Sequence, residues 1–419
     1  MHARHVLFLF QGDQTFEGER TVHALRILQQ RLRSHCPHVH LKRLRALLAC
    51  VAGALYGQRI TLTELGRALP SRAQIKHNIK RVDRLLGNPQ LGCERFSVYQ
   101  ASARWLLGPQ RRPVIVVDWS DLTTDRRWQL LRAALPVEGR TLTLYEEVHP
   151  LARFANPRVH RAFLARLKAL LPEGTIPIVL TDAGFRAPWF KAVSRLGWQW
   201  VGRIRNRDHV QRAASAHWHP CKTLYPQARL RPQSLGPYQI VRSNPVACQL
   251  HLVRQPRRHR HHLSLLGKRI HSNQSLKKAS ANREPWLLAA SPCLAHASAS
   301  QIVALYRQRM SIEEGFRDLK CERYGLGFAL NLSHKPERLG ALLLIAMLAL
   351  LVLWLIGSAA SARCAQKHYQ SNTQHKRRTL SLIYLALLIL RRNAEHFRPP
   401  ELLTPLRALQ LDSPLPFTA

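Results

Sequence analysis

Residues 306–320 read YRQRMSIEEGFRDLK, a stretch in which chemically committed side chains recur at fixed spacing. The spacing predicts one helix, on which four polar residues fall within an arc of about 60° at about 100° per residue: Tyr306, Arg309, Glu313 and Lys320. Apolar residues form a neighbouring stripe: Leu305, Ile312, Phe316 and Leu319. This pattern is typical of a helix half-buried in a core, with one edge packed and the other presenting a carboxylate flanked by cations.

The ordinary interpretation of such a stripe is a solvated helix face joined by i,i+4 ion pairs. Two further charged residues of the stretch have to be placed relative to this stripe. Glu314 competes with Glu313 for a functional role, but it lies about 100° away from it on the helix. Arg317 falls at roughly 20° and belongs to the polar stripe as a fifth member. Features elsewhere in the chain indicate whether this stripe is functional.

Charge gives the first indication of a partner. The chain has 419 residues and a formal net charge of +40, from 64 Lys and Arg against 24 Asp and Glu. This length favours two to four domains. Because the excess is spread along the sequence and far exceeds what solubility needs, it predicts a polyanionic partner, of which nucleic acid is the commonest.

The eight cysteines show no CxxC pair, which argues against zinc ribbons and a disulfide scaffold and favours buried thiols in a reducing cytoplasm. The first ten residues contain a short apolar run without a following cleavage site, and we interpret them as an extension. Residues 339–362 form an uncharged segment long enough to cross a bilayer. Its single occurrence, its basic flanks and its closeness to the polar stripe favour a buried central helix instead.

Residues 40–90 predict a small helical domain. Thr61 and Glu64 have the spacing of a capping box, and Pro70 and Ser71 predict a tight turn before a longer helix that ends before Gly87. That helix is expected to carry a basic row: Arg72, Lys76, Lys80 and Arg84. A helix-turn-helix-like DNA reader is one interpretation, and a basic surface on an ordinary helical bundle is the other.

Two predicted strands each end in an aspartate. VIVVDWSD at 114–121 is a buried strand predicted to stop at Asp118, and IPIVLTDAGF at 176–185 gives a second one ending at Asp182. A hairpin and a helix separate them. Because active sites in α/β sheets gather at the carboxyl ends of strands, the two aspartates are expected to converge and, with Glu313, to hold magnesium. Taken singly, either aspartate is ordinary as a cap or turn residue, and Asp121 competes with Asp118.

The segment from Arg205 to Arg283 is rich in proline and basic residues, and residues 254–262 read RQPRRHRHH. Its histidines suggest a metal site, but the interleaved arginines would repel a cation and the spacing is not that of zinc ligands. A basic insertion that touches a nucleic-acid backbone is the preferred interpretation.

These motifs resemble those of a known family. Tyr306-x2-Arg309-x3-Glu313-x6-Lys320 is similar to the signature of bacterial DDE transposases of insertion sequence family four, enzymes of the cut-and-paste type. The resemblance extends over about residues 25–395 and includes TLTELGRALP, KHNIKRVDRLLGN, VDWSD, TLYE, TDAGF, EPW, IEEGFRDLK and YGLG. The departures are Thr181 in place of a serine, a differently composed insertion, and the first two dozen residues.

The resemblance implies an α/β fold: an RNase H-like catalytic core with a β-rich insertion, preceded by an all-helical DNA-binding domain and followed by a helical C-terminal region. The expected boundaries are an extension at 1–25, the helical domain at 26–108, the core at 109–205 and 289–360, the basic insertion at 206–288, and a C-terminal dimerisation region at 361–419. Within the last region, residues 379–392 predict an amphipathic helix.

The same resemblance implies a transposase that binds the terminal inverted repeats of an insertion sequence in double-stranded DNA, nicks each end, forms and opens a hairpin, and joins the 3′ ends to target DNA. Asp118, Asp182 and Glu313 would be catalytic and would hold two Mg²⁺ ions, with Mn²⁺ as a substitute. The protein would act as a dimer in the synaptic complex, in the bacterial cytoplasm on the nucleoid, with no membrane and no small-molecule cofactor.

The resemblance also assigns DNA contacts. Tyr306, Arg309 and Lys320 would grip the backbone near the reacting phosphate, and Arg317 is expected to face phosphate too. Trp286 would stack on a base flipped from the hairpin, or else be a core tryptophan. Two other function classes stay open: a DNA-binding protein without catalysis, and a membrane protein anchored by residues 339–362.

Overall fold

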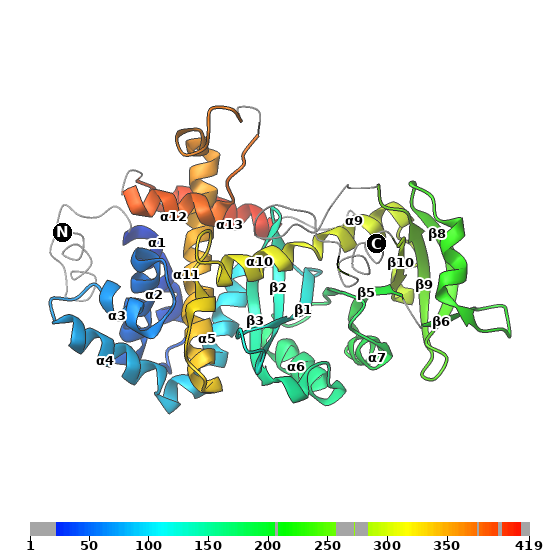
Figure 1. Ribbon diagram of the computed structural model, residues 1–419, viewed down its shortest axis with the longest axis horizontal. Coiled ribbons are helices and arrows are strands. Elements are labelled where there is room, and N and C mark those ends of the chain that lie inside the picture. Colours follow the sequence, from blue (N-terminus) through cyan, green and yellow to red (C-terminus); the bar gives the residue numbers. More distant parts are fainter. Residues whose placement is uncertain are drawn as a thin grey trace.

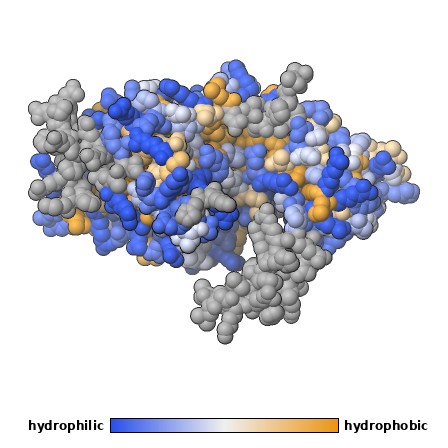
Figure 2. All heavy atoms as spheres, turned by 90° about the horizontal axis from the view of Figure 1, so that it is seen from above, coloured by the Kyte–Doolittle hydropathy of each residue, from blue (hydrophilic) through white to orange (hydrophobic). Residues whose placement is uncertain are grey.

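A ten-stranded sheet runs through the middle of the protein, in the order β3-β2-β1-β4-β5-β10-β9-β8-β6-β7. The computed structural model describes residues 22–205, 208–256, 272, 284–374, 377–392 and 396–411. Within these ranges the fold is mixed α/β. An N-terminal helical group and the long helix α11 lie on one side of the sheet's first half, and the strands of the second half extend away on the other side (Figure 1). The face shown in Figure 2 is mostly hydrophilic, with hydrophobic side chains gathered mainly near its centre.

The first half of the sheet contains both predicted buried strands and the predicted hairpin. Its strands are β1 (Val114–Asp121), β2 (Trp128–Val137), β3 (Arg140–Pro150), β4 (Ile178–Thr181) and β5 (Gln199–Ile204). β1, β4 and β5 run parallel, whereas β2 is antiparallel to β1 and β3. Glu138 and Gly139 join β2 to β3 with positive φ angles of 41° and 76°, as a two-residue hairpin turn requires.

The second half of the sheet comes from the predicted insertion. Its strands are β6 (His209–Arg212), β7 (His219–Pro220), β8 (Gln233–Ile240), β9 (Val246–Val253) and β10 (Trp286–Ala290). β10 pairs antiparallel with both β5 and β9, so these strands continue the sheet of the first half. The basic run at 254–262 lies outside the described residues from position 257 onward.

Helices before the sheet form the predicted helical group: α1 (Val22–His35), α2 (Leu41–Gly57), α3 (Leu62–Ala68), α4 (Ile75–Leu86) and α5 (Pro89–Leu107). Thr61 caps α3 by accepting a hydrogen bond from the Glu64 amide. The predicted tight turn at Pro70 is wrong, because residues 69–74 separate the two helices. The Ser71 hydroxyl accepts a hydrogen bond from the Ala73 amide within a bend and does not cap α4. Arg72 consequently precedes α4 instead of lying on it.

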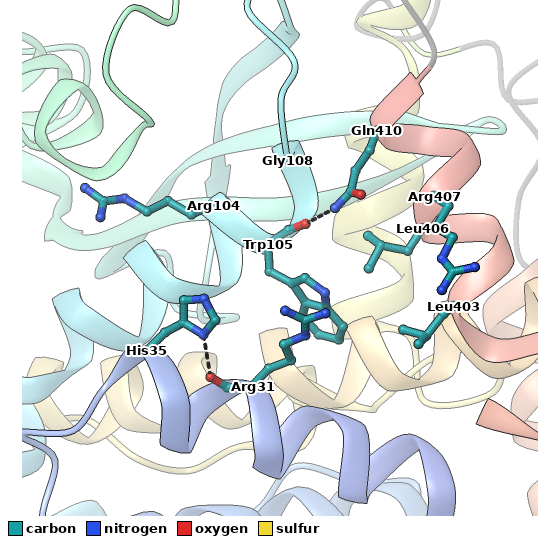
Figure 3. Close-up of a pocket in the computed structure, with 9 residues that line it drawn as sticks. All are labelled: Arg31, His35, Arg104, Trp105, Gly108, Leu403, Leu406, Arg407 and Gln410. Carbon is teal, nitrogen blue, oxygen red and sulfur yellow. Dashed lines mark hydrogen bonds between the residues drawn. The ribbon is translucent and has the colours of Figure 1, made fainter. Parts of the chain in front are cut away.

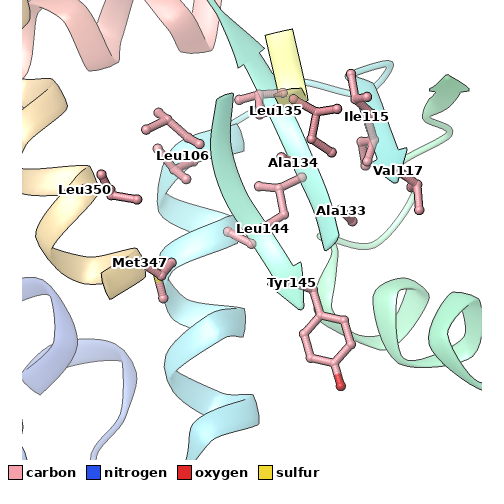
Figure 4. Close-up of a cluster of buried hydrophobic side chains, with 14 of the residues drawn as sticks. Leu106, Ile115, Val117, Ala133, Ala134, Leu135, Leu144, Tyr145, Met347 and Leu350 are labelled. Carbon is pink, nitrogen blue, oxygen red and sulfur yellow. The ribbon is translucent and has the colours of Figure 1, made fainter. Parts of the chain in front are cut away.

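The uncharged segment forms the centre of α11 (Pro336–Ala362), a helix of 27 residues. In the described chain it is the one unbroken helix long and apolar enough to cross a membrane, and its most apolar window is fully buried inside the fold. Met347 and Leu350 of α11 pack with Leu106 of α5 against the hairpin strands (Figure 4). This packing supports the interpretation of a buried core helix.

The remaining helices cover the sheet or α11: α6 (Pro157–Leu170), α7 (Ala187–Arg195), α9 (Ala299–Gln308), α10 (Ser311–Lys320), α12 (Leu382–Arg392) and α13 (Pro399–Leu411). α12 and α13 both pack against α11. The amphipathic helix predicted at 379–392 is therefore present as α12, but its apolar face is buried within its own chain. α13 was not predicted; Pro399 and Pro400 open it, a position at which proline is tolerated.

Candidate active site

Asp118 and Asp182 lie at the same edge of the sheet. The prediction that β1 stops at Asp118 is wrong, since the strand continues to Asp121 through its antiparallel pairing with β2. Its parallel pairing with β4, however, ends at Val116 opposite Leu180. Asp118 therefore follows the last parallel pair, and Asp182 directly follows β4. Both carboxylates are placed where parallel strands of an α/β sheet present functional groups.

Local backbone amides orient the two carboxylates. The Trp119 amide donates to Asp118 Oδ1 at 2.8 Å, and the Gly184 amide donates to Asp182 Oδ1 at 2.8 Å. A Cβ at Gly184 would lie only 3.0 Å from the same Asp182 oxygen, so this close approach favours glycine. A backbone amide thus orients one oxygen of each aspartate.

The stretch 306–320 is not the single helix that its spacing predicts. α9 ends at Gln308 and α10 begins at Ser311. Between them the Arg309 and Met310 amides bond the carbonyls three residues back, at 3.1 and 3.2 Å. The Ser311 hydroxyl donates to the Gln308 carbonyl at 2.6 Å. A tight turn therefore separates Tyr306 from the residues of α10 and leaves Arg309 at the junction.

Arg309 joins the sheet to the helix. Its Nη1 donates to Asp118 Oδ2 at 3.2 Å, and its Nη2 donates to Glu313 Oε1 at 2.6 Å. The arginine is buried, at 8% exposed, whereas the Glu313 side chain is 53% exposed. The sequence-predicted carboxylates on β1 and α10 are thus brought together around one guanidinium.

The charges of Asp118 and Asp182 interact in this site. Burial, followed by the charge of Asp182, raises the pKa of Asp118 to about 7, and the Arg309 guanidinium opposes that rise. The Asp118 carboxylate is therefore hard to ionise fully beside Asp182 unless more positive charge is present.

Asp118 and Glu313 are arranged around Arg309, while Asp182 acts on Asp118 through its charge. Among the described residues no three His, Cys, Asp or Glu side chains are close enough together to hold a metal ion. The chemistry of the donors nevertheless fits a divalent cation, because hard carboxylate oxygens suit Mg²⁺ and the repulsion between Asp118 and Asp182 is what such a cation relieves.

Lys320 approaches the same strand from the far end of α10. Its Nζ donates to Ser120 Oγ at 2.6 Å and also to the Asp121 carbonyl, and it lies 5.3 Å from the centre of the Phe316 ring. Burial, with the nearby Arg132, lowers the pKa of Lys320 to about 8. The lysine is held beside β1, two residues beyond Asp118.

Glu314 and Arg317 face a different neighbourhood. Glu314 pairs with Arg140 of β3 at 2.6 Å, and Arg317 pairs with Glu314 at 3.6 Å and lies over the Tyr324 ring. Glu313, which contacts Arg309, is the glutamate on the aspartate side. The functional role of Glu313 and the assignment of Arg317 to phosphate remain predictions.

Tyr306 and Trp286 pack against each other, with ring centres 5.1 Å apart and planes at 79°. Tyr306 is only 3% exposed, and its burial raises the pKa of its hydroxyl to about 12. Trp286 begins β10 and is half-buried against the core. The tryptophan therefore keeps part of its surface available beside the site, while the tyrosine ring is covered.

Arg203 of β5 belongs to the same neighbourhood and was not predicted. Thr181 of β4 pairs with Gly202, so Arg203 lies level with Asp182. Its Nε and Nη2 are buried without a hydrogen-bond partner among the described groups, and burial is the main cause that lowers its pKa. Buried guanidinium nitrogens without a partner are costly and suit a site for an anion. Its only sequence signal was an arginine in an apolar strand, GRIR at 202–205.

The predicted basic row lies apart from these residues, on the helical group. Lys76, Lys80 and Arg84 are exposed along α4, and Arg72 is exposed ahead of it. α4 crosses α3 closely at Gly66, where a Cβ would lie 2.6 Å from the Ile79 side chain. Ile75 is 56% exposed, and the buried positions of α4 are Asn78, Val82, Leu85 and Leu86.

Comparison with known proteins identifies the family. No curated protein is significantly similar to the chain. Among solved structures, the chain is similar to the piggyBac transposase synaptic complex with hairpin DNA, with 11% sequence identity and a TM-score of 0.39 over 96% of this chain and 85% of that one. Residues 109–352 match the family of the transposase DDE domain. The match spans more than half of the chain and includes Asp118, Asp182 and Glu313, and the protein belongs to this family of transposases.

Proposed function

We propose that the protein is a bacterial transposase of insertion sequence family four, which cuts the DNA at the terminal inverted repeats of its element and joins the 3′ ends to target DNA. The observation that carries the proposal is that Arg309 bonds both Asp118 and Glu313 at the carboxyl edge of the sheet, where the charge of Asp182 also acts on Asp118. Family membership supplies the reaction class, DNA cleavage and strand transfer assisted by divalent metal ions.

The fold that goes with this proposal is an RNase H-like core. The strand order β3-β2-β1-β4-β5, with only β2 antiparallel, supports it. The domain boundaries proposed are those expected from the sequence: 26–108, 109–205, 206–288, 289–360 and 361–419. Within that scheme β10 is the strand that connects insertion and core, since it pairs with both.

Asp118, Asp182 and Glu313 would hold two Mg²⁺ ions, or Mn²⁺ in their place. When bound, these ions supply Lewis acidity that activates the attacking hydroxyl and stabilises the leaving oxygen. The chain's own residues orient the DNA. Buried Arg309 and half-buried Arg203 would offer guanidinium groups to phosphate, and Lys320 adds a third cation beside β1.

The reaction order proposed is nicking, attack of the freed 3′-hydroxyl on the opposite strand to form a hairpin, hairpin opening, and strand transfer. Trp286 would stack on a base extruded at the hairpin, which its half-exposed ring beside Tyr306 supports. Tyr306 would reach phosphate only through its hydroxyl, because its ring is buried.

The remaining DNA contacts and partners follow from charge and reaction. Arg72, Lys76, Lys80 and Arg84 are exposed and would bind the duplex at the transposon end. Two ends must be held together, so the protein would act as a dimer on DNA. It would work in the bacterial cytoplasm, bound to the nucleoid.

The test is cleavage of a labelled duplex that carries the inverted repeat flanking the gene, with Mg²⁺ and with chelator. The wild type is expected to yield a nick and then a hairpin on a denaturing gel, only with the cation. Retained binding without any product in Mg²⁺ or Mn²⁺ would instead identify a DNA-binding protein without catalysis.

A further inference from the structure

A basic groove lies away from the candidate active site, where helices from both ends of the described chain meet. It has a volume of about 300 Å³ and is lined by residues of α1, α5 and α13 (Figure 3). Arg31, His35, Arg104 and Arg407 contribute cationic or titratable groups, and no Asp or Glu lines it. An anion is the class of ligand that this lining suits.

The three arginines of the groove are available to a ligand. Arg31, Arg104 and Arg407 are exposed, and none of them forms an ion pair with a carboxylate within the described part of the chain. Arg31 lies 5.8 Å from the centre of the Trp105 ring, which steadies its position without neutralising its charge. Arginines elsewhere on this surface do have carboxylate partners, such as Arg363 with Glu401 of α13.

Contacts between distant segments fix the shape of the groove. Gln410 of α13 donates to the Trp105 carbonyl at 2.5 Å, across 305 positions of the chain. Gly108 has a positive φ of 54°, and a Cβ there would lie 2.7 Å from the Gln410 side chain. Trp105 and Leu406 are both buried beneath the groove. The groove is thus a built surface and not a chance gap between mobile side chains.

The directions of the arginines distinguish between anions. In Figure 3 the guanidinium group of Arg104 points away from those of Arg31 and Arg407, and the three groups do not converge on one position. A single phosphate group would be chelated by converging donors, whereas spaced donors suit a polymer whose charges are spaced too. This arrangement favours the sugar-phosphate backbone of nucleic acid over a free phosphate.

The groove lies at a distance from the candidate active site. Gly108 precedes the amino end of β1, and Asp118 lies beyond the parallel part of that strand. Val114 and Asp118 alone are separated by about 13 Å along the strand. We propose that the groove binds the backbone of duplex DNA outside the cleaved position, an inference that rests on the proposed function in that it assumes a DNA substrate.

The experiment compares two double variants of the full-length protein: Arg31→Gln with Arg407→Gln in the groove, and Arg161→Gln with Arg195→Gln on exposed positions of α6 and α7. Binding of a 40-base-pair duplex is measured by fluorescence anisotropy over a series of salt concentrations without metal. The groove variant is expected to lose about 1.8 from the slope of log K against log[salt], at about 0.9 per lost phosphate contact. A similar loss in the control variant, or none in the groove variant, would overturn the proposal.

Two further measurements keep the result interpretable. Thermal unfolding checks that both double variants are folded; if the groove variant is not, Arg104→Gln replaces it, with an expected slope loss of about 0.9. Inorganic phosphate is titrated against the same proteins. Phosphate-dependent stabilisation of the wild type that the groove variant lacks, without a change in the DNA slope, would assign the groove to a free anion and contradict the proposal.

The groove proposal and the proposed function can be refuted independently of each other. Cleavage by the wild type with an unchanged salt slope in the groove variant would refute the groove alone. If the groove variant loses its part of the salt slope but the wild type does not cleave DNA, the catalytic function is refuted and the groove proposal is not.

Discussion

Arg309 Nη1 lies 3.2 Å from the Asp118 carboxylate, although the two residues are 191 positions apart in the chain. The same guanidinium bonds Glu313, so it neutralises part of the charge that a divalent cation would otherwise meet. Asp118 and Asp182 repel each other, and Arg309 is the nearest compensating group. In the DNA-free protein this arginine would therefore compete with a metal ion for two of its proposed ligands.

Replacing Arg309 by glutamine is expected to strengthen binding of Mn²⁺ to the DNA-free protein by about tenfold or more, since a charge-assisted hydrogen bond contributes about 1.5 kcal/mol or more. Isothermal titration calorimetry measures the affinity. Arg317→Gln is the matched control, because Arg317 contacts Glu314 and not the aspartates. Weaker metal binding in the Arg309 variant would show that the guanidinium supports the site and does not compete for it.

The two adjacent glutamates allow a sharp test of the catalytic set. Glu313→Gln is expected to abolish nicking while leaving binding to the transposon end within about twofold, because only a partly exposed charge is removed. Glu314→Gln should retain cleavage, since Glu314 pairs with Arg140 on the other side of α10. Gel assays of nicking and of end binding measure both. The assignment is reversed if the Glu314 variant is the inactive one.

Lys320 makes the site sensitive to pH. Its pKa is lowered to about 8, so the ammonium is present below that pH and is lost as the pH rises through it. Its contribution to holding phosphate should decline between pH 7 and pH 9, with log Kd rising by at most about 1 per pH unit for one proton. Bound phosphate favours the charged form, which moves the midpoint upward in the complex.

Lys320→Arg tests this directly, because arginine keeps its charge throughout that range. Binding of pre-nicked end DNA by the arginine variant should vary less between pH 7 and pH 9 than binding by the wild type. Identical pH profiles for the two proteins would mean that another group titrates.

Spacing and strand pattern predicted much of this site. Apolar β-branched runs located β1 and β4, and the polar stripe singled out Glu313, because both signals depend on local periodicity. Local periodicity could not show that a tight turn divides the stripe at Arg309, nor that β1 continues beyond Asp118. Both depend on partners distant in sequence: the side-chain contact to Asp118 and the pairing with β2.

Arg203 and the basic groove could not be predicted from local periodicity either. Arg203 matters because β4 and β5 pair in a register that sets it beside Asp182. The groove exists because α1 and α13, at opposite ends of the described chain, meet on α5. In so basic a chain, single arginines carry little signal, and only the tertiary structure separates the buried or clustered ones from the rest.

A buried ion pair beneath α10 leads to the last prediction. Arg132 of β2 and Glu146 of β3 are cross-strand partners at 2.7 Å, with side chains 2% and 1% exposed. Tyr99 also donates to Glu146, and the Arg132 guanidinium lies 5.1 Å from the Phe316 ring centre. The pair thus supports the helix that carries Glu313.

Removing one partner of a buried pair leaves an uncompensated charge, so Arg132→Leu is expected to lower the free energy of unfolding by about 3–5 kcal/mol. Adding Glu146→Gln removes that charge but keeps an oxygen that accepts from Tyr99, and it should restore most of the loss. Urea unfolding of the two single variants and the double variant measures the coupling. A double variant no more stable than Arg132→Leu would contradict this account, because the cost would then come from lost packing against Phe316 and not from the unpaired Glu146 carboxylate.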